Sequence, residues 1–125
     1  MREIIATKQA PAAVGPYSQA VKHNGVIYIS GQLPIDPVSG EICKGSIAEK
    51  TKQAMNNLQA IAVAAGSDLS RAIKLTVFLT DLGNFGEMNE AYGAFFAKEP
   101  PARCCFEVTA LPKGCDIEID AIIAE

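Results

Sequence analysis

The sequence predicts an α+β fold, a two-layer sandwich in which two helices cover one face of a mostly antiparallel sheet. Two segments carry apolar residues at helical spacing, and the shorter segments around them alternate apolar and polar residues as strands do. Each amphipathic helix must bury one face, and the sheet offers one face for both helices to cover. The expected order is β-β-β-α-β-α-β-β, in a single domain that spans residues 1–125.

Composition and charge disfavour a nucleic-acid-binding protein and a membrane protein. Hydrophobic residues make up 49% of the chain, which is enough for a core. The net charge is −3 and no basic block occurs, so a nucleic acid partner is disfavoured. No apolar run approaches the roughly 18 residues of a membrane span, and the N-terminus lacks the apolar core of a signal peptide. We therefore expect a cytoplasmic protein.

Three strands are expected before the first helix. Glu3 to Ala6 is a short edge strand, and Tyr17 to His23 and Val26 to Ser30 form a pair. Asn24-Gly25 separates the pair, and this dipeptide favours the tight hairpin turn in which both central residues have positive φ.

The first helix begins after Ser46. Ser46 and Glu49 form a capping box, in which each side chain bonds a backbone N–H at the helix start. Gly66 is a good helix stop. The apolar stripe between them is Ile47, Ala54, Met55, Leu58, Ile61, Ala62 and Ala65.

The second half is expected to add three strands and a helix. A strand at Ala72 to Thr80 has one apolar face, and a helix follows from about Phe85 to Lys98. Two strands finish the chain, Ala102 to Leu111 and Cys115 to Ala124, with Leu111 to Gly114 joining them as a hairpin. Apolar residues remain on the second face of the sheet, which must meet water or another subunit.

Arg103 and Cys105 are the first candidates for chemistry. They are two residues apart on an expected strand, so they share a face. A half-buried arginine needs an anionic partner, which is either Glu107, a neighbouring subunit or a ligand carboxylate. Cys105 is either a small apolar filler or a thiol that the nearby cation activates.

Glu118 lies in the alternating acidic row Asp116, Glu118, Asp120. Such a row is typical of a solvated strand face. The alternative is a general acid or base whose pKa is raised by partial burial.

Tyr17, Ser30 and Gly31 form a third candidate group at strand ends. They either serve turn geometry only or offer a hydroxyl and free N–H groups to a ligand. The four cysteines match no zinc spacing, the one histidine, His23, lies beside a turn, and nucleotide-binding glycine motifs are absent.

Six motifs, in order along nearly the whole chain, resemble those of the RidA family, also called YjgF, in its enamine/imine deaminase branch. They are Gly15-Pro16-Tyr17-Ser18-Gln19-Ala20, Ser30-Gly31-Gln32-Leu33-Pro34, Thr76-Val77-Phe78-Leu79-Thr80-Asp81-Leu82, Pro101-Ala102-Arg103 with Cys105, Leu111-Pro112-Lys113, and Ile117-Glu118-Ile119. The resemblance implies a chorismate-mutase-like fold and a homotrimer with ligand clefts between subunits. It implies hydrolysis of reactive 2-imino and enamine acids, such as 2-aminoacrylate and 2-iminobutanoate, to 2-oxo acids and ammonia, with no metal or organic cofactor.

The same resemblance implies roles for individual residues. Arg103 clamps the substrate carboxylate, and Glu118 holds and activates the attacking water. The residues that complete the pocket are Tyr17, Ser30, Gly31 and the backbone around Cys105. Tyr17 and Ser30 are expected from the subunit opposite Arg103, and Cys105 becomes a pocket wall instead of a nucleophile.

Two departures from the family pattern lie beside Arg103. Cys104 stands where this branch commonly has serine, and the segment between Phe96 and Pro101 is shorter than in many members. Because both lie next to Arg103, they bear on which substrates the pocket accepts. The alternatives to a deaminase are a non-catalytic protein that binds small carboxylates, a ribonuclease or translation inhibitor, and a chaperone-like protein.

Overall fold

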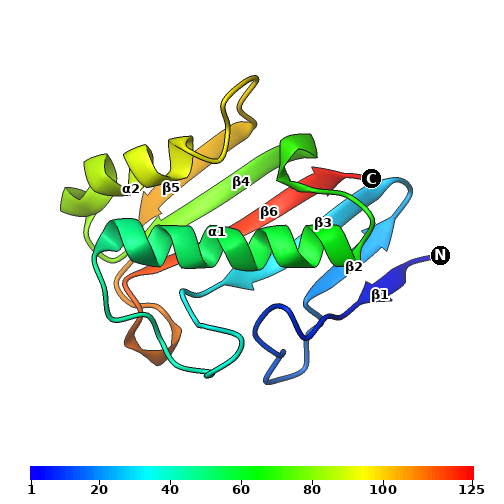
Figure 1. Ribbon diagram of the computed structural model, residues 1–125, viewed down its shortest axis with the longest axis horizontal. Coiled ribbons are helices and arrows are strands. Elements are labelled where there is room, and N and C mark those ends of the chain that lie inside the picture. The colour runs from blue at the N-terminus through cyan, green and yellow to red at the C-terminus, as the bar shows by residue number, and fades with distance from the viewer.

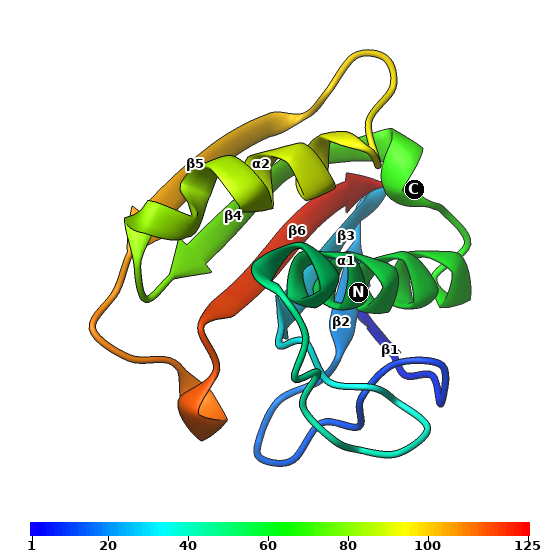
Figure 2. The ribbon, with the colours of Figure 1, turned by 60° about the vertical axis from the view of Figure 1, so that its left-hand side comes forward.

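Six strands form one sheet in the computed structural model, which covers residues 1–125, and two helices lie across one face of it (Figures 1 and 2). The strand order is β1-β2-β3-β6-β4-β5, and every neighbouring pair is antiparallel except β4 and β5. The predicted fold class is confirmed. The strands are β1 (Glu3–Ile5), β2 (Ala20–His23), β3 (Val26–Gln32), β4 (Ala72–Leu79), β5 (Ala102–Glu107) and β6 (Ile117–Ala124), and the helices are α1 (Ile47–Ala64) and α2 (Phe85–Gly93).

The elements with local signals follow the sequence closely. At the turn between β2 and β3, Asn24 and Gly25 have φ values of 51° and 78°, as the predicted hairpin turn requires. Both hydrogen bonds of the Ser46–Glu49 capping box are present. Every residue of the predicted apolar stripe of α1 is buried. The chain leaves the helix at Gly66, whose φ of +90° favours glycine.

The second helix is shorter than predicted, because α2 ends at Gly93 instead of Lys98. The N–H groups of Phe95 and Phe96 bond to carbonyls three residues back, which tightens the last turn. Glu99 then adopts a φ of 47° directly before Pro100, and proline disfavours the right-handed helical conformation in the residue that precedes it. The two phenylalanines still pack against the core.

The predicted hairpin between the last two strands is wrong. β5 pairs in parallel with β4, and β6 lies between β3 and β4, so β5 and β6 are not neighbours. The helix α2 connects β4 to β5 as a crossover, which is the connection that parallel strands need. Four alternate residues of this central strand are almost fully buried on the face that α1 covers: Ile117, Ile119, Ala121 and Ile123. Pro112–Gly114 forms a short 3₁₀ turn in the longer connection.

The face of the sheet that points away from the helices is called the open face below. Its side chains include Ile4, Val21, Tyr28, Lys74, Thr76, Phe78, Cys104, Phe106, Glu118, Asp120 and Ile122. Phe78 and Phe106 stack on it with their ring centroids 6.3 Å apart, and Phe106 is 51% exposed. Neither helix combines the length and the hydrophobicity that crossing a membrane requires.

Candidate functional site

A cavity of about 740 Å³ lies where β3 ends and β6 begins, and it gathers four of the six predicted site residues. The four are Tyr17, Ser30, Gly31 and Glu118. They come from the segment before β2, from β3 and from β6, so the sheet itself brings them together. Pro112 and Lys113 of the turn before β6 also line this cavity.

A β-bulge of β3 lines the cavity. The register between β3 and β6 shifts between Ile29 and Gln32, so Ser30 and Gly31 occupy the irregular step. The Ser30 hydroxyl donates to the carbonyl of Ser18 at 2.6 Å. Gly31 has no side chain, and the Glu118 carboxylate fills the space above it. An added Cβ at Gly31 would lie 2.2 Å from Glu118 Oε2, so the carboxylate occupies this place only while residue 31 is glycine.

Glu118 has the character of a general acid or base. Its side chain is half-buried, and no hydrogen bond joins the carboxylate to another group of the chain. Burial, and then the negative charge of Asp120, raise the pKa of Glu118. The carboxylate therefore keeps its lone pairs free for water, and it exchanges a proton closer to neutral pH than an exposed glutamate does.

One wall of the cavity is the loop before β2. The buried amide of Gln19 donates to the carbonyls of Thr7 at 3.0 Å and Pro11 at 2.8 Å, and it accepts from the Thr7 N–H at 2.6 Å. Tyr17 is 51% exposed at the mouth, and its hydroxyl accepts from the N–H of Val14 at 3.4 Å. The loop is thus held by hydrogen bonds before any ligand arrives.

Two residues that line the cavity are held by Asn57, which no sequence motif indicated. The Asn57 amide donates to the carbonyls of Leu33 at 3.2 Å and Ile35 at 2.9 Å, and both of these residues line the cavity. Asn57 lies three residues after Ala54 and four before Ile61 of the predicted apolar stripe. A polar residue on that buried face was the signal that could have found it.

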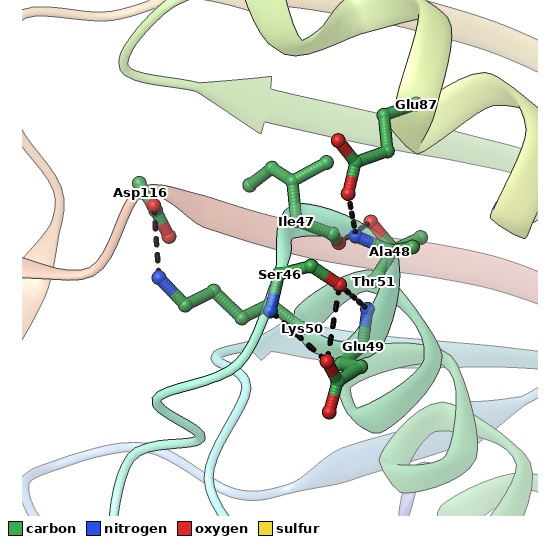
Figure 3. Close-up of polar contacts among 8 residues, drawn as sticks. All are labelled: Ser46, Ile47, Ala48, Glu49, Lys50, Thr51, Glu87 and Asp116. Atoms are coloured by element: carbon green, nitrogen blue, oxygen red, sulfur yellow. Dashed lines mark hydrogen bonds and ion pairs between the residues drawn. The ribbon is translucent and has the colours of Figure 1, made fainter.

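The start of α1 anchors the start of β6 (Figure 3). Lys50 Nζ lies 3.0 Å from Asp116 Oδ2, two residues before Glu118. Glu87 of α2 accepts from the N–H of Ala48 at 2.9 Å, which joins the two helices at the same end. The position of Glu118 therefore depends on contacts from α1 as well as on the sheet.

Arg103 lies on the other face of the sheet. It pairs with Leu75 of β4, and its guanidinium carbon lies 4.8 Å from the centre of the Tyr92 ring and 5.4 Å from that of Phe85. Arg103 Nη1 donates to Asn89 Oδ1 at 2.7 Å. The ion pair with Glu107 that the sequence left open is not formed within the chain, and Glu107 Oε1 instead accepts from the N–H of Leu82 at 2.9 Å.

Cys105 shares the face of Arg103, as the spacing predicted, and packs against the core. Burial raises the pKa of the Cys105 thiol, and the opposing effect of the Arg103 charge is smaller. The thiol therefore stays protonated at neutral pH, which fits a wall and not a nucleophile. No group of three or more His, Cys, Asp or Glu side chains is placed to hold a metal ion.

Within one chain the structure forms two separate groups. Glu118 lies with Tyr17, Ser30 and Gly31, while Arg103 lies with Cys105 beneath α2. Because Glu118 pairs with Phe78 on the open face and Arg103 with Leu75 on the helical face, one small ligand cannot contact both within a chain.

Comparison with known proteins gives consistent matches. A family model described as endoribonuclease L-PSP matches residues 7–125. The RutC family protein y4sK of Sinorhizobium fredii is 54% identical over 124 residues, which cover 99% of this chain and 98% of that protein. The 2-iminobutanoate/2-iminopropanoate deaminase of Mus musculus is 47% identical over 125 residues, covering 100% and 93%. The crystal structure of E. coli TdcF with bound serine has a TM-score of 0.94 at 40% identity and covers 98% of each chain.

Proposed function

This chain belongs to the endoribonuclease L-PSP family, which is the RidA (YjgF) family, and from that membership we propose that it is a hydrolase that deaminates reactive 2-imino and enamine acids. The substrates are small acids such as 2-aminoacrylate and 2-iminobutanoate, and the products are 2-oxo acids and ammonia. The observation that carries the proposal is Glu118, a half-buried carboxylate with a raised pKa and no hydrogen-bond partner in the chain, at a cavity. The 47% identical deaminase of Mus musculus supports the reaction class.

The chemistry needs few groups. An enamine first becomes an imine by gaining a proton on carbon and losing one from nitrogen. Water then attacks the imine carbon while Glu118 accepts a proton from it, and the nitrogen takes up a proton. In the resulting carbinolamine the hydroxyl proton passes to the amino nitrogen, and the C–N bond breaks to release ammonia as the carbonyl forms. Acid–base help of this kind contributes about 10²- to 10⁴-fold to a rate, and a fixed substrate adds the benefit of proximity.

Arg103 of a second copy of the chain binds the substrate carboxylate. A guanidinium binds a carboxylate through two parallel hydrogen bonds, and Arg103 has no ion pair within its own chain. We propose a homotrimer in which the open faces pack together. The exposure of Tyr28 and Phe106 on that face supports this packing. Each cavity then receives an Arg103 from the neighbouring subunit. We propose the cytoplasm as the compartment.

Subunit mixing tests this arrangement directly. Arg103→Ala and Glu118→Ala are each expected to be inactive in an assay for ammonia and 2-oxo acid release from 2-aminoacrylate. When the two variants are unfolded together and refolded in equal amounts, about a quarter of the clefts combine an intact Glu118 with an intact Arg103. Activity should therefore return to about a quarter of the wild-type value.

The matched control mixes wild type with the double variant Arg103→Ala/Glu118→Ala. If each cleft is built from two chains, about a quarter of the clefts receive wild-type residues from both, so activity should be about a quarter of wild type. If the site lies within one chain, activity should be about half. If the two single variants stay inactive when mixed, the shared cleft is wrong. If wild type does not accelerate ammonia release at all, the deaminase function is wrong.

A second candidate function is binding of small carboxylates without catalysis. The serine in the E. coli TdcF structure favours it, because serine is an amino acid with a carboxylate. In that case wild type and Glu118→Gln would bind 2-oxobutanoate with similar affinity, and neither would release ammonia from 2-aminoacrylate.

A further inference from the structure

The groups that contact the Arg103 side chain within the chain carry no charge. Its Nη1 donates to Asn89 Oδ1 at 2.7 Å, and this is the only hydrogen bond of its side chain. The rings of Phe85 and Tyr92 lie at 5.4 Å and 4.8 Å from its guanidinium carbon. These three residues stand at positions i, i+4 and i+7 of α2, so they form one face of the helix. We call this face, Phe85, Asn89 and Tyr92, the α2 shelf.

Arg103 forms no ion pair within the chain. Glu107, on the same strand as Arg103, accepts from the N–H of Leu82, and Glu87 of α2 accepts from the N–H of Ala48. The positive charge of Arg103 is therefore not neutralised by the shelf, which offers an amide oxygen and two π faces. Because Asn89 bonds only to Nη1, the edge formed by Nε and Nη2 keeps its parallel N–H donors free.

We propose that the α2 shelf is a positioning device that holds the Arg103 guanidinium with its Nε–Nη2 edge ready for the carboxylate of a 2-imino or 2-oxo acid. Asn89 is a positioning residue in this scheme, because it acts through Arg103. The identity of the anion rests on the proposed function. A long arginine side chain loses much rotamer freedom when it binds, and ordering it beforehand increases affinity.

The first measurement uses NMR to test whether the Arg103 side chain is ordered in the absence of a ligand. The chain has three arginines, Arg2, Arg71 and Arg103, so ¹⁵N-labelled arginine gives few side-chain NMR signals. In wild type we expect a sharp, resolved Nε–H signal for Arg103 and an averaged signal for the exposed Arg2. In Asn89→Ala the Arg103 signal should broaden or move toward the averaged position. The control is Glu90→Ala, the adjacent exposed residue of α2, which should leave the spectrum unchanged.

The second measurement is calorimetric binding of 2-oxobutanoate. Asn89→Ala should weaken binding about tenfold, since a hydrogen bond to a charged group is lost. In the deaminase assay the same variant should raise KM about tenfold and change kcat less than twofold, because the carboxylate is held equally in ground and transition states. Asn89→Asp keeps the acceptor oxygen, so the Arg103 signal stays resolved. Its charge competes with the ligand, so affinity falls at least as far.

The outcomes separate this inference from the proposed function. If wild type binds 2-oxobutanoate and its Arg103 signal is ordered, but it releases no ammonia, the α2 shelf is supported and the deaminase proposal is wrong. An averaged Arg103 signal in wild type, full affinity in Asn89→Ala, or complete rescue by Asn89→Asp overturns the shelf even if the deaminase is active. No binding of 2-oxobutanoate by wild type also overturns it.

Discussion

The close approach of Gly31 and Glu118 makes Gly31→Ala an informative substitution. The added Cβ would lie 2.2 Å from Glu118 Oε2 and 2.8 Å from Cδ, whereas an ordinary contact begins at 3.4 Å. The carboxylate must therefore retreat by about 1.2 Å. A misplacement of about 1 Å in a reacting group can cost about 10²-fold in rate. We expect the deaminase rate of Gly31→Ala to fall by about that factor.

Stability should change little in the same variant, because the atoms that collide belong to the end of a flexible, half-exposed side chain. We expect a change in the free energy of unfolding of less than about 1 kcal/mol by urea titration. The matched control is Gly93→Ala at the end of α2, where an added Cβ meets no atom within 4 Å. That variant should keep its full rate.

Two results would refute this reasoning. If Gly31→Ala keeps the wild-type rate, then either Glu118 does not act from the position seen above Gly31 or it takes no part in the reaction. If the rate falls but the unfolding free energy falls by several kcal/mol as well, the loss reflects damage to the β-bulge and not the displacement of one carboxylate.

Four further predictions concern Glu118, its neighbour and the helices. Asp120→Asn removes a like charge, so the pKa of Glu118 falls and the acid limb of the pH–rate profile moves to lower pH. Folding raises the pKa of Glu118, so the protonated side chain stabilises the fold below the ordinary glutamate pKa, and this contribution is lost as pH rises through the raised value. Glu118→Gln stays neutral at every pH. It should therefore be more stable than wild type at neutral pH, but not at acid pH, in urea titrations. Tyr92→Phe should gain about 1 kcal/mol of stability in thermal melts, since it removes a buried hydroxyl that has no hydrogen-bond partner in the chain. A loss of stability would mean that the hydroxyl bonds a second copy or a ligand. Ser46→Ala loses the capping box and should cost about 1 kcal/mol in urea titrations, with no change in KM; an equal stability would show that the cap contributes nothing.

Local signals in the sequence predicted much of the fold. Ser46, Gly66 and the Asn24-Gly25 turn each act on backbone within a few residues, so their effects could be inferred without knowing any distant contact. The alternation of Arg103 and Cys105 likewise indicated correctly that they share a face. Fold class followed from these elements because two amphipathic helices need one sheet face to cover.

Strand neighbours could not be predicted in the same way. Alternation shows which residues of a strand share a face, but it does not show which strand lies beside it. Leu111 to Gly114 has the composition of a hairpin turn, yet β5 pairs with β4 and β6 lies beyond it. The positions of Arg103 and Glu118 on opposite faces depend on that pairing, so the sequence alone could not separate the two groups of site residues.

The central place of β6 has a consequence for synthesis of the chain. β6 is the last strand of the sheet in chain order, yet it lies between β3 and β4 and pairs with both. A ribosome that adds roughly 5–20 residues per second needs several seconds to pass from Gln32 to Ile117. During that time the backbone edge of β3 that later pairs with β6 has no partner strand. The nascent chain is therefore expected to resist proteases only after β6 has left the ribosomal tunnel.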